Sequence, residues 1–287
     1  MTRIIRTKSH EEWLEHRGYG IGSSEVATIL GVNPYETPRQ LWLRKKGLVP
    51  PKEETFAMRA GHYLEDAVAK FWSDATGKTI IKNSAEEIIF VSDKSDIFRA
   101  SPDRLFWVED GSRKESNKGI LECKTTQKSI DENDIPKMWF CQLQWLMGCS
   151  GKKYGSLAWL TAGREFGYKD FEFNETFYEW MCNKVKEWWD RYIDGDDEPP
   201  LINATDVNDK FPVHEEGKQK EVSENIDKVY EDLKKTREQI SILQELKTKE
   251  EDLIKVYMED AEALTKDGEV LITFKANKSG KRVFLFK

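Results

Sequence analysis

Helical and strand-like patterns alternate along residues 1–195, and their order narrows the choice of fold more than any other property of the chain. Apolar residues at helical spacing cover residues 59–77, with Gly77 as the stop, and residues 136–151. The strand-like segments are residues 86–92, 98–109, 119–126 and 153–173. Helix, strands, helix, strand, helix is the layout of an α/β or α+β domain. A further helix should begin behind Ser23 or Ser24, either of which can cap it.

The chain changes character after residue 195. Residues 196–220 are acidic, contain prolines and lack apolar periodicity, as expected of a linker. Residues 221–264 are rich in Glu and Lys, with apolar side chains three, four or seven positions apart, which predicts an amphipathic helix or helical hairpin. The last twenty residues alternate apolar and polar on both sides of "NKSGK" and predict a terminal β-hairpin. We therefore predict a core domain over 1–195, a linker over 196–220, and a helical segment plus hairpin over 221–287.

Composition excludes several classes of protein. Charged residues make up 34% of the 287 residues, no apolar run approaches the roughly 20 residues of a membrane helix, and the N-terminus lacks the apolar core of a signal peptide. We therefore expect a cytoplasmic protein. Four cysteines without a C-x-x-C pair and four scattered histidines argue against a zinc or histidine-built centre. The net charge of −7 argues weakly against general nucleic-acid binding, although a local basic groove remains compatible with it.

The stretch "SPDRLFWVEDGSRKESNKGILECK", residues 101–124, carries the candidate chemistry. Glu122 and Lys124 lie two apart on a strand and so share a face, and antiparallel pairing with the preceding strand brings Asp103 near Glu122. Two carboxylates with a backbone carbonyl between them suit a hard cation such as Mg²⁺, or Mn²⁺, and a neighbouring lysine suits phosphodiester hydrolysis. Taken alone, the spacing is more typical of an ordinary hairpin with a solvated face, and only further residues can favour a catalytic centre.

Five sequence blocks, found in order between residue 13 and about residue 160, resemble one known family. They are "WLEHRGYGIGSSEVATILGVNPYETPRQLWLRKKG", "AGHYLEDAVAKFW", "RASPDRLF", "LECKTT" and "CQLQWLMGCSGKKYGSLAWL". This text is similar to the YqaJ-type viral recombinases, which are related to λ exonuclease and belong to the PD-(D/E)xK nuclease superfamily. The resemblance implies a restriction-endonuclease-like core, a central mixed β-sheet flanked by helices, over residues 1–195.

The resemblance also implies roles for individual residues. Asp103 and Glu122 match the principal metal ligands, joined by the Cys123 carbonyl, while Glu65 matches the helix-borne acid that completes the site and Lys124 the lysine beside the nucleophilic water. The residues that match DNA or 5′-phosphate contacts are Arg17, Ser24, Ser101, Gln142, Gln144 and Met58. Which of the two glutamines reaches DNA stays open, and Met58 matches an apolar wedge at the terminal base pair. Many relatives have a tyrosine where this chain has Leu146, which weakens the case for an aromatic contact there.

The function implied is Mg²⁺-dependent 5′→3′ exonuclease digestion of double-stranded DNA ends, leaving 3′ single strands for a single-strand annealing protein. A homo-oligomer, a trimer in the λ-type relatives, is implied by the resemblance only. Two alternatives remain at this point. One is an endonuclease acting on branched or foreign DNA, and the other is a non-catalytic DNA-binding or scaffold protein.

Overall fold

The structure is a computed structural model that describes residues 2–51, 53–81, 88–109 and 111–287. The chain separates into two compact units, residues 1–213 and residues 214–287. The division at residues 195 and 220 that we expect from the sequence stays a prediction. Within the described ranges, no helix combines the length and the apolar character needed to cross a membrane.

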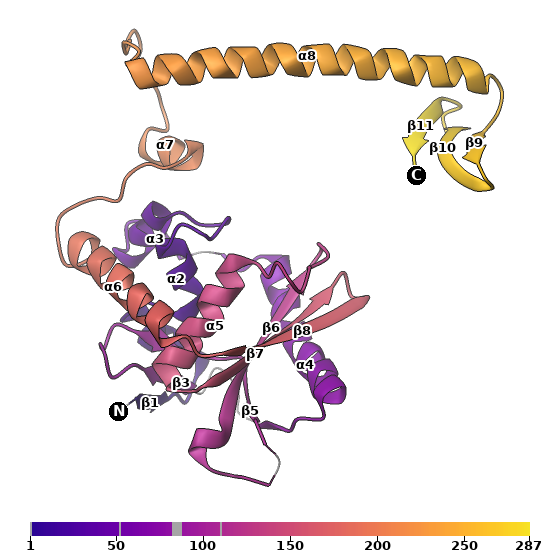
Figure 1. The fold of residues 1–287 in the computed structure, drawn as a ribbon. Coiled ribbons are helices and arrows are strands. Elements are labelled where there is room, and N and C mark those ends of the chain that lie inside the picture. Colours follow the sequence, from indigo (N-terminus) through magenta and orange to yellow (C-terminus); the bar gives the residue numbers. More distant parts are fainter. Residues whose placement is uncertain (1, 52, 82–87, 110) are drawn as a thin grey trace. The chain divides into compact units, whose positions relative to one another are not determined.

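A five-stranded mixed sheet forms the centre of the first unit, in the order β2-β5-β6-β7-β8 (Figure 1). Its strands are β2 (Ile80–Ile81), β5 (Arg104–Trp107), β6 (Lys118–Thr126), β7 (Tyr154–Thr161) and β8 (Glu165–Glu172). β6 and β7 are parallel, and the other pairs are antiparallel. Because parallel neighbours need a crossover, helix α5 (Lys137–Ser150) connects β6 to β7. The predicted fold class, a central mixed sheet flanked by helices, is confirmed.

Helices cover both faces of this sheet (Figure 1). On one face, α4 (Phe56–Thr76) packs Val68 and Trp72 against Phe106 of β5 and Leu121 of β6. On the other face lies α5, followed by α2 (Ser23–Ile29) and α6 (Glu175–Tyr192). Strand alternation therefore directs Glu122 and Lys124 of β6 toward the α5 side of the sheet.

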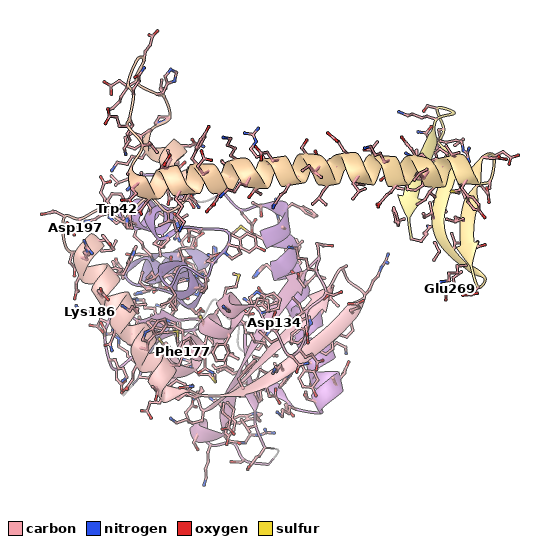
Figure 2. All side chains as sticks on the ribbon, turned by 45° about the horizontal axis from the view of Figure 1, so that its top comes forward. Trp42, Asp134, Phe177, Lys186, Asp197 and Glu269 are labelled. Carbon is pink, nitrogen blue, oxygen red and sulfur yellow. The ribbon has the colours of Figure 1, made fainter. Side chains whose placement is uncertain are left out.

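The larger core is built around aromatic side chains. Trp145 of α5 is fully buried and packs edge-on against Phe98 and Tyr178. Phe177 of α6 stacks on Phe140 of α5, with ring centroids 5.4 Å apart (Figure 2). These contacts fix α5, which carries both candidate glutamines, against α6.

The first unit also contains a small antiparallel sheet, three short α-helices and one 3₁₀ helix. The sheet has the order β1-β3-β4. These elements are β1 (Arg3–Arg6), α1 (His10–Gly18), α3 (Pro38–Lys45), β3 (Ile88–Val91), β4 (Arg99–Ala100), the 3₁₀ helix η2 (Glu115–Asn117) and α7 (Ala204–Lys210). The fully buried Asp206 of α7 accepts a 2.6 Å hydrogen bond from Thr37, the N-cap of α3. Part of the segment expected to be a linker is thus attached to the first unit.

The second unit consists of one long helix and a three-stranded sheet (Figure 1). The helix is α8 (Glu224–Met258), and the strands β9 (Ala263–Lys266), β10 (Glu269–Ala276) and β11 (Arg282–Phe286) have the order β11-β10-β9. Of the two possibilities, an amphipathic helix or a helical hairpin, α8 is the single helix. The predicted terminal hairpin is β10–β11, to which β9 adds an edge.

Two local predictions need correction. The segment 98–109 is two short strands and not one, because Ser101, Pro102 and Asp103 leave the extended ladder between β4 and β5. The N-cap of α2 is Gly22 and neither serine: its N–H donates to the Glu25 carboxylate at 2.9 Å. Ser24 therefore lies inside the first turn, where its hydroxyl is not needed for capping.

Candidate functional site

Asp103 and Glu122 meet through strand register. β5 and β6 are antiparallel with Arg104 opposite Leu121, so Asp103, one residue before β5, lies beside Glu122. The Asp103 carboxylate accepts a 2.7 Å hydrogen bond from the Cys123 N–H. The bond fixes one oxygen of Asp103 at the edge of β6.

The Glu122 carboxylate is buried and only half satisfied. Its side chain is 2% exposed, and its Oε1 accepts hydrogen bonds from Lys124 Nζ at 2.7 Å and from Gln142 Nε2 at 2.5 Å. Its Oε2 is buried without any hydrogen-bond partner in the described structure. Burial alone would lower the pKa of Lys124, but the carboxylates of Glu122 and Asp103 raise it, so the ammonium group stays charged.

Glu65 of α4 adds a third carboxylate. His62 Nδ1 lies 3.5 Å from its Oε1, and Arg104 Nη1 lies 4.0 Å from its Oε2. Burial first, and then the charge of Asp103, raise the pKa of Glu65 to about 7 and that of Glu122 to about 8. Burial also raises the pKa of Asp103. The three acids disfavour one another's ionisation, which marks a cluster with an excess of negative charge.

The arrangement of these acids fits a hard divalent cation. Across the described ranges, no three His, Cys, Asp or Glu side chains are already drawn together around one point. The free oxygen of Glu122, together with Asp103 and the Cys123 carbonyl, nevertheless supplies oxygen donors of the type that Mg²⁺ and Mn²⁺ take. Glu65 stands close enough to influence the charge of this cluster. An unpartnered buried carboxylate oxygen is costly unless a cation satisfies it.

Arg17 of α1 places a positive charge close enough to Asp103 and Glu122 to interact with their carboxylates. Its Nη2 donates a 3.3 Å hydrogen bond to the Ser24 hydroxyl, and its guanidinium lies 4.5 Å from the centre of the Trp13 ring. In the described part of the chain, Arg17 makes no ion pair with a carboxylate. Burial lowers the pKa of Arg17, although Glu25 opposes that effect. Trp13 in turn donates a 3.2 Å hydrogen bond to the Ser101 hydroxyl, which links this group to the strand edge that carries Asp103.

The start of α2 is held in place by a buried charge network. Glu25 accepts hydrogen bonds from the Gly22 N–H and from Arg44 Nη1, and pairs with Lys45 Nζ, each at 2.9 Å. Burial would raise the pKa of Glu25, but Lys45 and Arg44 outweigh it and lower that pKa. Because Ser24 immediately precedes Glu25, this network fixes the position of the Ser24 hydroxyl beside Arg17.

The three acids and the side chains of Lys124, Arg17 and Ser24 line one cavity of about 730 Å³ in the first unit, whereas the Glu25 network lies behind it. The lining contains ten of the residues that the sequence pointed to: Arg17, Ser24, Met58, Glu65, Ser101, Asp103, Glu122, Cys123, Lys124 and Gln142. Gln144 lies outside it. The Gln144 amide donates to the Glu172 carbonyl at 2.9 Å and accepts from the Asn174 N–H at 2.9 Å. Of the two glutamines, the structure thus places Gln142 in the cavity and Gln144 against β8 and the start of α6.

Sequence reasoning missed several residues that line or support the cavity. Trp13 lies four residues before Arg17, one helical turn away, and that spacing could have indicated that the two side chains share one face of α1. His62 lies three residues before Glu65, and this spacing could likewise have indicated that the two side chains share one face of α4. Glu25, three residues after Gly22, matches the acid of a capping box, but nothing in the sequence pointed to its partners on α3.

Comparison with known proteins assigns the chain to a family. It is 31% identical over 266 residues to the uncharacterized protein YqaJ of Bacillus subtilis strain 168, covering 88% of this chain and 80% of that protein. The chain belongs to the YqaJ-like viral recombinase family. The model of the YqaJ-like viral recombinase domain matches residues 12–153, which include every acidic residue of the cavity lining.

Two solved structures are also similar to this chain. An alkaline exonuclease from Laribacter hongkongensis is 18% identical, with a TM-score of 0.48 over 64% of this chain and 93% of that chain. A phage-related exonuclease from Haemophilus somnus 129PT is 13% identical, with a TM-score of 0.43 over 61% and 95%.

Proposed function

We propose that this chain is a metal-dependent deoxyribonuclease with its active site in the 730 Å³ cavity. One observation carries the proposal: the Asp103–Glu122 pair and Arg17 line the same cavity. Among the described residues, the Arg17 guanidinium has no carboxylate partner. An acidic cluster suits a metal ion and a neighbouring unpaired guanidinium suits a phosphate, so the cavity matches both halves of a phosphodiester site. Membership of a viral recombinase family supports DNA as the substrate.

Mg²⁺, or Mn²⁺ in its place, fits the donors of this cavity. Asp103, Glu122 and the Cys123 carbonyl would hold it, with Glu65 completing the site, and the unpartnered Glu122 Oε2 supports this set. When bound, the ion would supply Lewis-acid polarisation of the phosphoryl group and stabilise charge on the leaving oxygen.

The side chains around the acids have separate tasks in this proposal. Lys124, held by Glu122 and by a 2.8 Å hydrogen bond to Gln142 Oε1, would donate to the attacking water and orient it toward phosphorus. Because Lys124 stays charged, it would also offset negative charge that develops on the phosphoryl oxygens. Gln142 would hold the side chains of Lys124 and Glu122 in position through its two hydrogen bonds to them.

End recognition would come from the Arg17 side of the cavity. Arg17 and the Ser24 hydroxyl, with Ser101 nearby, would bind a terminal 5′-phosphate through charge-assisted hydrogen bonds. Met58, about half exposed at 48%, would contact the terminal base pair as an apolar wedge. A site that holds a 5′-phosphate favours 5′→3′ digestion of duplex ends.

The biological setting follows from that activity. Digestion from 5′ ends leaves 3′ single strands, the substrate of a single-strand annealing protein, which is the partner we propose. We retain the homo-oligomer, a trimer by resemblance, as part of the proposal. The four free cysteines, all buried, agree with action in a reducing cytoplasm.

The test uses linear and closed circular duplex DNA, labelled at the 5′ or the 3′ end, with Mg²⁺ or with a chelator. We expect linear DNA to be degraded from its 5′ ends only with Mg²⁺, and circles to be spared. Asp103→Asn should abolish digestion, whereas Asp66→Asn, which changes a 90% exposed carboxylate of α4 outside the cavity, should not. Cleaved circles would establish the endonuclease alternative, and equal digestion by wild type and Asp103→Asn would overturn the assignment.

A further inference from the structure

Helix α8 carries an apolar stripe that its own unit does not cover. Every residue of α8 is described, and Met258 alone is buried. Figure 2 shows its side chains projecting from the helix all along its length. The stripe consists of Ile226, Val229, Leu233, Ile240 and Leu243, whose exposed fractions lie between 48% and 62%. A helix of 35 residues in water normally depends on packing of such a face for its stability.

The spacing of the stripe specifies the kind of partner. Its members, with Thr236 between Leu233 and Ile240, follow steps of three and four residues, which is the seven-residue repeat of a coiled coil. In that repeat, Ile226, Leu233 and Ile240 take the first core position, and Val229, Thr236 and Leu243 take the second. A face with this period is complementary to another helix with the same period.

We infer that α8 pairs in parallel and in register with α8 of a second copy of this chain, over residues 226–243, in a contact between two copies that is additional to the trimer implied by resemblance. The two stripes then meet layer by layer, with each apolar residue facing its own counterpart. The paired segment is about 27 Å long, at 1.5 Å per residue. It ends before Lys247 and Glu250, which occupy the next two core positions and would place like charges opposite each other.

The charges that flank the stripe favour the parallel orientation. In a parallel pair, the residue before one core layer faces the residue five positions further along the second helix. This brings Asp232 opposite Arg237 of the second copy, an attractive pair formed twice by symmetry. Among the described residues Arg237 has no ion-pair partner, while Asp232 has a 3.6 Å contact to the exposed Lys235.

An antiparallel arrangement loses the attractive charge pair. In the antiparallel register that keeps the whole stripe in contact, Ile226 faces Leu243 and Val229 faces Ile240. Asp232 then lies opposite Gln239 and Arg237 opposite Tyr230, so no opposite charges meet beside the stripe. The second copy in parallel orientation is therefore the occupant that the side chains of α8 select, and the inference does not depend on nuclease activity.

Two isoleucines provide a matched test. Ile240 lies on the stripe and Ile242 lies about 200° around the helix from it, at exposed fractions of 48% and 64%. The molar mass of the assembly that the full-length chain forms in solution should fall for Ile240→Asp and stay at the wild-type value for Ile242→Asp. Equal masses for wild type and both variants, or dissociation by Ile242→Asp, would overturn the inference.

Charge exchange tests the register independently of folding. Asp232→Lys and Arg237→Glu should each raise the dissociation constant on the order of tenfold, because each makes both symmetric pairs repulsive. The double variant restores opposite charges and should return to within about threefold of wild type. A double variant weaker than either single one would show that the charges act within each helix, and would refute the pairing.

A cross-link tests the orientation. The native cysteines are buried, so under oxidation Ile226→Cys should link two copies through a disulfide. A link that forms only between Ile226→Cys and Leu243→Cys chains would show the antiparallel arrangement, against the inference.

Discussion

Replacing Glu122 by glutamine should remove a pH dependence from the stability of the metal-free protein. Burial and the charge of Asp103 raise the pKa of Glu122 from 4.5 to about 8 in the folded chain. Between these values the folded state holds a proton that the unfolded chain has released, so the free energy of unfolding falls as pH rises. The contribution is fully present below about pH 4.5 and is lost progressively up to about pH 8.

The structure sets the size of the effect. A shift of roughly 3.5 pH units, from 4.5 to about 8, corresponds to at most about 5 kcal/mol. Because Asp103 and Glu65 share the repulsion, we expect on the order of 3 kcal/mol from Glu122 itself. Glutamine has the same shape, keeps an acceptor for Lys124 and does not titrate.

Urea unfolding at pH 5 and pH 8 with a chelator measures the difference. Wild type should lose stability between the two pH values, and Glu122→Gln should lose about 3 kcal/mol less. Glu172→Gln, at an exposed position at the end of β8, is the control and should behave as wild type. If wild type and Glu122→Gln lose the same stability between pH 5 and pH 8, the buried acidic cluster does not exist as described.

Three further results are expected. At pH 8, Mg²⁺ at 100 times its dissociation constant should raise the free energy of unfolding of the wild type by about 2.7 kcal/mol. It should leave that of Glu122→Gln unchanged, because the ion needs the unpartnered carboxylate oxygen. A wild type that Mg²⁺ does not stabilise would contradict the metal site. Glu25→Gln should cost about 3–5 kcal/mol in denaturant unfolding because it leaves Lys45 buried without its carboxylate, and a loss below about 1 kcal/mol would show that the network does not hold α2. Arg17→Gln should lower kcat/KM about 10- to 100-fold on 5′-phosphorylated ends and hardly change it on 5′-hydroxyl ends, whereas equal losses on both would refute phosphate binding by Arg17.

The part of the site set by local chain geometry was predictable from sequence. Strand alternation puts Glu122 and Lys124 on one face, and a single antiparallel register brings Asp103 to them. Only 18 residues lie between Asp103 and Glu122, so no contact between distant parts of the sequence is needed. The order of helical and strand patterns similarly predicted the mixed α/β fold.

The parts that depend on tertiary packing could not be predicted. Gln142 and Gln144 project about 200° apart on α5, and only the packing of that helix between the sheet and α6 decides which one faces the cavity. The capping of α2 by Gly22 depends on Glu25, which α3 holds through Lys45. No pattern local to α2 reveals that partner.

The rate of DNA hydrolysis by a Lys124 variant tests the central claim most directly. Single-turnover digestion of 5′-phosphorylated linear duplex with Mg²⁺ should be at least about 100-fold slower for Lys124→Ala, because a charged donor beside the reacting phosphate contributes on that order. Lys128→Ala, at an exposed position just after β6, should digest at the wild-type rate, and circular dichroism should show that both variants are folded. Equal rates for wild type and a folded Lys124→Ala would contradict a catalytic centre built on Asp103, Glu122 and Lys124.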